Sequence, residues 1–432
     1  MTVTTVPCRH GTHACNTCFI SDAGSWSVAR RGREQGSMTR PSVTRIGPIR
    51  YARAARFQRP APVPVIEDDT AGQICLQAPQ RLAAAMGPCA DLPQGEDCLN
   101  LVVTTPGCDN ARRPVMVFLH GGAFGSGAGL MPWYDGTALA GDAEVVVVSV
   151  NYRLGVFGYL CLDGVSEPNL GLYDQLEALR WVQVHIAAYG GDPDNVTVFG
   201  QSAGALSIRL LMEVPEAKGL FARAILQSGP AAYLARPRDE AEEIGAVFAR
   251  HLAADARTAS VPALLAAAGE TAAALARSGA VSVPPFYPVR GAAPLAQLGA
   301  TFADNVAGLE VLCGWNADDA SAFTGPGPRV QELTHQLFAE PITAFIDQLN
   351  QSGAHARGYR FTWWPDGSQF GATHGMELPL LLGDRRAWQR APMLGSASWD
   401  DIDQLGRQMR RAWGEFARTG TTPPPPPTLH WV

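Results

Sequence analysis

One stretch decides the fold of this chain: Val196-Thr197-Val198-Phe199-Gly200-Gln201-Ser202-Ala203-Gly204-Ala205. Its β-branched and aromatic residues predict a strand that ends at Phe199, and the apolar residues of 206–212 predict a helix. Between them, Gly-x-Ser-x-Gly permits a turn too tight for flanking side chains, which lifts the serine hydroxyl clear of the sheet. Ser202 is therefore the candidate nucleophile. In a chain with 45 glycines the pattern alone is weak, and an ordinary glycine-rich turn also fits it.

A second signal lies upstream, where the apolar run Val115 to Leu119 ends in His120-Gly121-Gly122. Acyl transfer needs N–H donors aimed at an oxygen that becomes negatively charged, and residues without side chains let their amides come close to it. The backbone amides of Gly121, Gly122 and Ala203 are the candidate donors. A plain turn at a strand end is the other interpretation of this motif, and the nearby serine turn argues against it.

Together these motifs resemble the type-B carboxylesterase family, which includes bacterial para-nitrobenzyl esterases and, more distantly, the cholinesterases. Further matching motifs follow along the chain: Glu96-Asp97-Cys98-Leu99-Asn100, Tyr134-Asp135-Gly136, Asn151-Tyr152-Arg153-Leu154-Gly155, Asp174-Gln175, Gly190-Gly191-Asp192-Pro193 and Gln227-Ser228-Gly229. The resemblance runs from about Ile46 to Trp431 and is weakest between Ala231 and Leu309. It implies an α/β-hydrolase fold, with a mostly parallel central sheet flanked by helices, and hydrolysis of carboxylic esters.

The triad acid follows from the family's order of nucleophile, acid and base. A strand-like run, Glu310 to Trp315, leads into Asn316-Ala317-Asp318-Asp319-Ala320, which is similar to the family's Asp-Glu-Gly loop and puts the acid at Asp319. The family usually has glutamate there, one methylene longer. Asp318 therefore stays an alternative, since either carboxylate can hold an imidazole in the required tautomer.

The base is predicted at His374, in Gly371-Ala372-Thr373-His374-Gly375-Met376-Glu377-Leu378-Pro379, which resembles the family's His-x-x-Glu-Leu-Pro block. By the same resemblance, Gln201 and Ser228 support the triad. The 55 residues from Asp319 to His374 (374 − 319) are fewer than is usual in the family. This implies shortened cap insertions, a shallower site and a preference for short to medium neutral esters.

The apolar pattern supports this fold. Six continuous apolar runs predict strands buried on both faces: Val115 to Leu119, Glu144 to Val150, Val196 to Phe199, Ala224 to Leu226, Val311 to Gly314 and Tyr359 to Trp363. Leu172, Leu176, Leu179, Val182 and Ile186 recur at three- and four-residue spacing, which predicts a crossover helix. Alternating strands and helices predict an α/β protein.

Composition excludes several classes of protein. The 432 residues are 46% hydrophobic and 17% charged, enough for one large domain with a substantial core. The net charge of −6 gives no reason to expect nucleic-acid binding, and no apolar run reaches the roughly 20 residues of a membrane span. The sequence leaves the oligomeric state open.

The two ends of the chain differ from the family. Residues 1–37 match nothing in the family, lack the apolar core of a secretory signal and carry Cys15-x-x-Cys18. Three interpretations stay open: a disordered leader, a protein that really starts at Met38, or a zinc site at the two cysteines. Residues 38–422 form the predicted catalytic domain. Residues 423–432 begin with five prolines and are predicted to be a stiff surface tail.

Cysteine usage bears on location. Cys75 and Cys98 fall where secreted relatives close a disulfide, so this pair could be oxidised. Nine cysteines is an odd number, and the chain shows no secretory signal, which favours reduced thiols and a cytoplasmic enzyme. Secretion remains the alternative.

The sequence thus predicts a serine carboxylesterase that acts on a small-molecule ester through an acyl-enzyme, without cofactor, metal, nucleic acid or membrane. Relatives that hydrolyse cationic esters have a glutamate before the nucleophile and a tryptophan between the paired cysteines. This chain has Gln201 and no tryptophan from Cys75 to Cys98, which argues against choline esters. The fold also carries catalytically silent adhesion proteins, so a scaffold is the alternative if Asp319 fails to reach the histidine.

Overall fold

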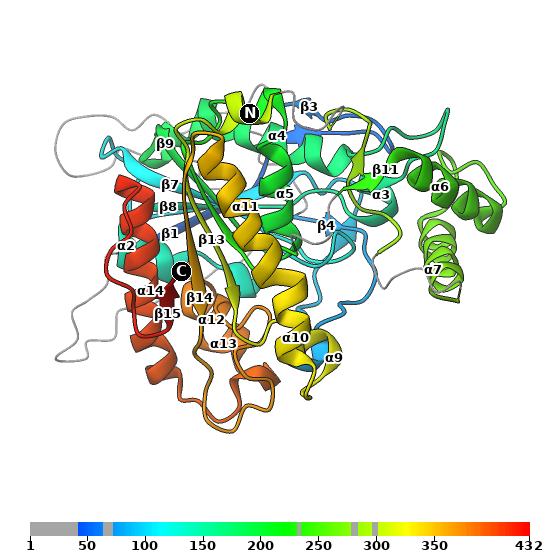
Figure 1. Cartoon of the computed structure of the whole chain (residues 1–432). Coiled ribbons are helices and arrows are strands. Elements are labelled where there is room, and N and C mark those ends of the chain that lie inside the picture. The colour runs from blue at the N-terminus through cyan, green and yellow to red at the C-terminus, as the bar shows by residue number, and fades with distance from the viewer. Residues whose placement is uncertain (1–41, 64–71, 231–234, 278–283, 296–300) are drawn as a thin grey trace.

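The structure of the protein is a computed structural model that describes residues 42–63, 72–230, 235–277, 284–295 and 301–432 (Figure 1). The predicted leader, 1–37, and its Cys15-x-x-Cys18 motif lie outside the described residues. Within them, one nine-stranded sheet organises the molecule. In spatial order its strands are β1 (Thr44–Arg50), β6 (Asn100–Thr105), β8 (Val146–Val150), β7 (Arg113–Leu119), β9 (Gly191–Gln201), β10 (Arg223–Gln227), β13 (Glu310–Asn316), β14 (His355–Phe361) and β15 (Leu429–Trp431).

The six strands from β8 to β14 run parallel, and antiparallel strands flank them at both edges. All six predicted strands lie in this parallel part. The predicted strand from Glu144 begins only at Val146, because Glu144 adopts φ +53° at the end of α2 (Thr137–Ala143). The mostly parallel sheet that the resemblance implied is confirmed.

Both faces of the sheet are covered, as the continuous apolar strands predicted. In β7, Val115, Val117 and Leu119 belong to one buried cluster, and Met116 and Phe118 belong to another. The first cluster includes side chains of α4 (Leu170–His185), α5 (Ala203–Leu211) and α11 (Glu340–Gln351), which cross the front of the sheet in Figure 1. The second includes side chains of α2 and α14 (Trp399–Thr419).

The remaining elements are short or peripheral. The other helices are α1 (Ala83–Met86), α3 (Gly155–Tyr159), α6 (Arg238–Leu252), α7 (Val261–Arg277), α8 (Phe302–Val306), α9 (Ser321–Thr324), α10 (Val330–Thr334), α12 (Leu378–Leu381) and α13 (Arg385–Trp388). Three two-stranded pairs join β2 (Ala52–Arg53) to β3 (Ala61–Pro62), β4 (Ile74–Cys75) to β5 (Gln94–Gly95), and β11 (Arg236–Pro237) to β12 (Val289–Arg290). The helices α6 and α7 form a pair to one side of the sheet (Figure 1). No helix within the described ranges is long and apolar enough to cross a membrane.

The C-terminal residues join the sheet. After the five prolines, β15 pairs antiparallel with β14, with Leu429 opposite Phe361 and Trp431 opposite Tyr359. The indole N–H of Trp431 donates to the carbonyl of Pro423 at 3.2 Å, which holds the proline run against the strand. The segment 423–432, predicted as a surface tail, therefore contains the ninth strand of the sheet.

Candidate active site

Ser202 occupies the turn between β9 and α5. Its backbone has φ +57° and ψ −120°, a conformation that L-residues rarely adopt and that costs about 1–3 kcal/mol. Two hydrogen bonds hold this turn: the Ser202 N–H donates to the Gln227 carbonyl at 2.8 Å, and the Leu206 N–H donates to the Ser202 carbonyl at 2.9 Å. The side chain is partly exposed while both neighbours in sequence are buried. The turn thus leaves Ser202 accessible between two buried neighbours.

The two glycines of the motif are required by close packing. A Cβ on Gly204 would clash with the carbonyl of Leu119, at the end of β7, and a Cβ on Gly200 would lie 2.8 Å from the same oxygen. Both flanks of the turn therefore press against the neighbouring strand. An ordinary glycine-rich turn carries no such constraint.

The candidate oxyanion loop, residues 120–123, follows β7 directly. Gly121 is buried, and a Cβ on it would lie 3.1 Å from the Ser202 Cβ and 2.7 Å from Gln201 Oε1. Gly122 has φ +116° and is partly exposed, and Ala123 after it has φ +54°. This loop therefore lies against the serine turn, which brings the predicted donors, Gly121, Gly122 and Ala203, into one place.

The buried ring of His120 supports this loop. Its ring is buried and stacks on Tyr152, with centroids 4.3 Å apart, and its Nδ1 lies 2.8 Å from the Gly121 carbonyl. Burial lowers the pKa of His120 to about 4, so the ring is neutral and Nδ1–H donates to that carbonyl. The Tyr152 hydroxyl donates to the His120 carbonyl at 2.6 Å.

The predicted acid and base are in direct contact. His374 Nδ1 lies 2.7 Å from Asp319 Oδ1, and both side chains are fully buried. Because a carboxylate only accepts hydrogen bonds, Nδ1 carries the proton and Nε2 bears the lone pair. Nε2 has no hydrogen-bond partner among the described residues. A buried imidazole whose unpaired nitrogen is basic is the form that a general base requires.

Asp319 is fixed at both oxygens. Its Oδ2 accepts from the Ser228 hydroxyl at 2.9 Å and from the Asn316 backbone N–H at 2.8 Å, which leaves Oδ1 for the histidine. Asp318 faces elsewhere: its carboxylate accepts from the Ala372 N–H at 2.9 Å and from the side-chain amide of Gln331. Of the two candidate acids, Asp319 contacts His374, and Asp318 holds the loop that carries it.

Contacts through neighbouring residues link the serine turn to the loop that carries the histidine. A Cβ on Gly375, next to His374, would lie 3.9 Å from Nε2 of Gln201, next to Ser202. The end of β10 also links Ser202 to Asp319. The Gln227 carbonyl accepts from the Ser202 amide, and the hydroxyl of Ser228 donates to Asp319. Gln201 and Ser228, predicted to support the triad, are both in these contacts.

Two phenylalanines that the sequence analysis did not single out pack on the imidazole. The Phe323 ring centroid lies 5.0 Å from that of His374, and the Phe338 centroid lies 5.5 Å from it. Phe338 is buried, whereas Phe323 is 55% exposed. The rings restrict the imidazole to one orientation and exclude water from part of it. Their distance from His374 in sequence gives no signal for this role.

A buried carboxyl beside the triad was also missed. Glu377 is fully buried; its Oε2 accepts from the Asn316 side-chain amide at 2.6 Å, and the Gln227 amide nitrogen lies 3.3 Å from its Oε1. The pKa of Glu377 is raised to about 7, chiefly because burial disfavours the charged carboxylate. The Asn316 hydrogen bond opposes this rise, and the negative charge of Asp319 adds to it. Gln227 Oε1 has no partner among the described residues, and a half-turn of that amide would offer it to the Glu377 proton.

Glu377 should make the protein less stable as pH rises. Its pKa is 4.5 when unfolded and about 7 when folded, so between these values the folded protein keeps a proton that the unfolded chain releases. The contribution is therefore fully present below pH 4.5 and is lost as pH rises through 7, with a slope of up to about 1.4 kcal/mol per pH unit. Urea unfolding from pH 5 to 8 should show this fall, and Glu377→Gln should flatten it. The exposed Glu332→Gln is the control and should keep the pH dependence of the parent. If the free energy of unfolding fell with pH equally in the parent and in Glu377→Gln, Glu377 would not be the group responsible.

Five of the described cysteines are free thiols: Cys75, Cys89, Cys98, Cys161 and Cys313. A hydrogen bond to the Cys75 sulfur, together with burial, raises the pKa of Cys98 well above its usual value. The pair that could have formed a disulfide is thus in contact in the reduced form. No cluster of three or more potential metal ligands occurs in the part of the chain that the structure describes.

Comparison with known proteins gives consistent matches. The model of the carboxylesterase family matches residues 30–324. A Rhodococcus erythropolis protein named probable N-octanoylanthranilate hydrolase is 40% identical over 93% of each chain. The para-nitrobenzyl esterase of Bacillus subtilis is 34% identical over 87% of this chain and 85% of its own. Among solved structures, a thermophilic para-nitrobenzyl esterase has a TM-score of 0.78 at 31% identity over 91% of each chain.

Proposed function

This chain belongs to the carboxylesterase family, and from that premise we propose that Ser202, His374 and Asp319 are the catalytic triad of a carboxylic ester hydrolase. The observation that carries the proposal is the 2.7 Å contact between His374 and Asp319, which leaves Nε2 of the imidazole without a partner among the described residues and available to the serine hydroxyl.

The proposed reaction has two halves. His374 Nε2 takes the proton of the Ser202 hydroxyl as Oγ attacks the ester carbonyl, and the amides of Gly121, Gly122 and Ala203 hold the oxyanion. The imidazolium then protonates the leaving alcohol, which departs and leaves an acyl-enzyme. Water, deprotonated by His374, attacks the acyl carbon and releases the acid and Ser202. The Ala123 amide, next to Gly122, is a further candidate donor that the sequence analysis did not name.

Active-site titration tests this function. A p-nitrophenyl alkylphosphonate should release one p-nitrophenolate per chain, and the phosphonyl group should be found on the peptide that contains Ser202. No labelling, in a protein that unfolds cooperatively, would favour the silent scaffold. The scaffold required an aspartate that fails to reach the histidine, and the contact of Asp319 with His374 speaks against it.

A second substrate class is N-acylated aromatic amines. The support is the Rhodococcus erythropolis relative, named as an N-octanoylanthranilate hydrolase, with 40% identity over 93% of this chain. The same triad serves amides, because the imidazolium can protonate a departing amine. Anthranilate release from N-octanoylanthranilate, followed by its fluorescence, tests this class directly.

Choline esters should not be preferred. A quaternary ammonium group is bound by carboxylates and by aromatic faces, whereas this chain has the neutral Gln201 before the nucleophile and no tryptophan from Cys75 to Cys98. We expect butyrylcholine and a neutral butyrate ester to have kcat/KM values of the same order. A kcat/KM for butyrylcholine that exceeds that of the neutral ester by tenfold or more would refute this.

We also propose a cytoplasmic location. It is supported by the free thiols of Cys75 and Cys98, since disulfides predominate in secreted proteins.

A further inference from the structure

A cavity of about 540 Å³ opens beside the oxyanion loop. Gly122 and Ala123 form one end of its lining, and Gly121, just before them, would place a Cβ 3.1 Å from that of Ser202. The rest of the lining comes from segment 76–81, α3, α7 and residues 284–286. An ester carbonyl held by the Gly122 amide would therefore have one of its substituents at the entrance of this cavity.

The lining is suited to an apolar group. The described residues that form it include a single charged side chain, Arg81, which is exposed. The volume falls within the range of about 300–1,000 Å³ typical of sites for small organic ligands. An uncharged chain of several carbons is the substituent that this lining favours.

The outer wall of the cavity is one face of α7. Leu265, Ala268, Gly269 and Ala272 recur at helical spacing and line the cavity, whereas Leu264, Ala267 and Thr271 are buried on another face of the helix. A Cβ on Gly269 would meet no atom within 4 Å. Gly269 is exposed, and the middle of the wall consists of the small residues Ala268, Gly269 and Ala272, with Leu265 and Leu275 on either side. It also lies in the region where resemblance to the family is weakest.

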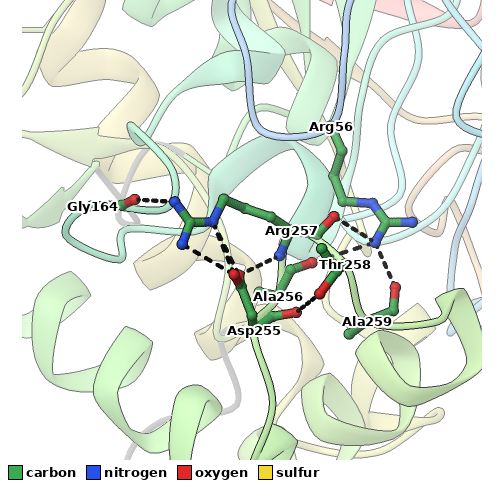
Figure 2. Close-up of polar contacts among 7 residues, drawn as sticks. All are labelled: Arg56, Gly164, Asp255, Ala256, Arg257, Thr258 and Ala259. Carbon is green, nitrogen blue, oxygen red and sulfur yellow. Dashed lines mark hydrogen bonds and ion pairs between the residues drawn. The ribbon is translucent and has the colours of Figure 1, made fainter.

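One arginine fixes the start of this wall. The turn before α7 is shown in Figure 2, where the Arg56 guanidinium reaches its backbone carbonyls. Nη1 of Arg56 donates to the carbonyl of Ala259 at 2.6 Å and to those of Ala256 and Arg257 at 3.3 and 3.5 Å. Glu96 orients the guanidinium, with Nε 2.9 Å from Oε2. Because α7 begins at Val261, this contact fixes the turn that leads into the helix.

We propose that this cavity binds the apolar chain of the substrate, that Gly269 sets the length of chain it accepts, and that Arg56 is a positioning residue for the α7 wall. The inference rests on the proposed function, because it needs an ester held at Ser202. Each methylene buried in the cavity raises kcat/KM by about fourfold, the equivalent of about 0.8 kcal/mol. The enzyme thus favours esters with a medium-length chain over acetates.

Filling the cavity tests the proposal. Gly269→Leu should lower kcat/KM for p-nitrophenyl octanoate tenfold or more and leave that for p-nitrophenyl acetate within twofold. Ala266→Leu is the matched control, since Ala266 is exposed on the same helix and is outside the lining; it should change neither value beyond twofold. If the ratio of kcat/KM for octanoate to kcat/KM for acetate is unchanged in Gly269→Leu, the proposal is overturned.

Two series of esters distinguish which side of the ester enters. In one series the acyl chain varies on p-nitrophenol, and in the other the alcohol varies on acetate, followed by titration of the released acid. The series whose chain-length dependence Gly269→Leu abolishes identifies the bound side. If both series keep their dependence, the cavity does not bind the chain.

Arg56→Met should reduce the ratio of kcat/KM for octanoate to that for acetate at least threefold, because the turn before α7 loses the hydrogen bonds that position it. Acetate turnover and phosphonate labelling should persist. Arg238→Met is the control: Arg238 is exposed and pairs with Glu242 within its own helix, α6. A uniform loss with both substrates, tracking a lower Tm, would show a merely structural role and overturn the positioning role. Phosphonate labelling and acetate turnover test the proposed function, whereas the octanoate to acetate ratio tests the cavity. Failure of the proposed function can therefore be distinguished from failure of the further inference.

Discussion

Ser202→Ala is expected to lower ester turnover by a factor on the order of 10⁴ or more, because no other group replaces the attacking oxygen. Alanine tolerates the strained turn no worse than serine does, so the fold should persist. The measurement is p-nitrophenyl butyrate turnover beside the Tm. Ser207→Ala is the matched control: Ser207 is buried in the helix that follows the turn, and its hydroxyl accepts from Gln175 at 3.1 Å.

His374→Ala should cause a loss of similar size, and the double variant should be little worse than either single one, because nucleophile and base act as a unit. Ser207→Ala should keep most of the activity at a cost of about 1 kcal/mol in stability. Turnover by Ser202→Ala within tenfold of the parent would show that another residue is the nucleophile.

Asp319→Asn should cost about 10⁴-fold in kcat, while Asp318→Asn should cost little. Two donors, the Ser228 hydroxyl and the Asn316 N–H, face one oxygen of Asp319, and the histidine faces the other. An asparagine keeps its oxygen for the two donors and turns its NH₂ toward His374 Nδ1. The imidazole must then carry its proton on Nε2, where it cannot accept the serine proton.

The paired aspartates provide the control. Asparagine at 318 can still accept from the Ala372 N–H, so its effect should fall mainly on stability. Both variants are compared by kcat at matched fractions of folded protein. A larger loss of kcat in Asp318→Asn at equal Tm would mean that Asp318 is the acid.

Local patterns in the sequence were sufficient for the six parallel strands of the central sheet and for the serine turn. Apolar runs buried on both faces are typical of the parallel strands of an α/β sheet, and the glycines of the turn are dictated by the Leu119 carbonyl. The choice between Asp318 and Asp319 was different. Adjacent residues of one loop point in different directions, and only the packed structure shows which carboxylate meets the imidazole.

The depth of the site could not be derived from spacing. The few residues between Asp319 and His374 suggested a shallow site, but the cavity beside Gly122 is formed by α3, α7 and segment 76–81. That spacing therefore does not set its volume. The middle of the α7 wall consists of alanines and a glycine, which give no sequence signal for binding. Glu377 likewise stands in a recognisable motif, yet its raised pKa arises from burial among side chains distant in sequence.

The C-terminal strand has a further consequence. Without β15, the hydrogen-bonding groups of Tyr359–Phe361 in β14 would form a bare edge on a large apolar sheet, and such edges recruit strands from other molecules. Prolines cannot donate to a ladder, so the run before β15 offers no replacement. A chain shortened at this end would thus keep its triad and still tend toward self-association, a hazard to avoid when tags or truncations are chosen.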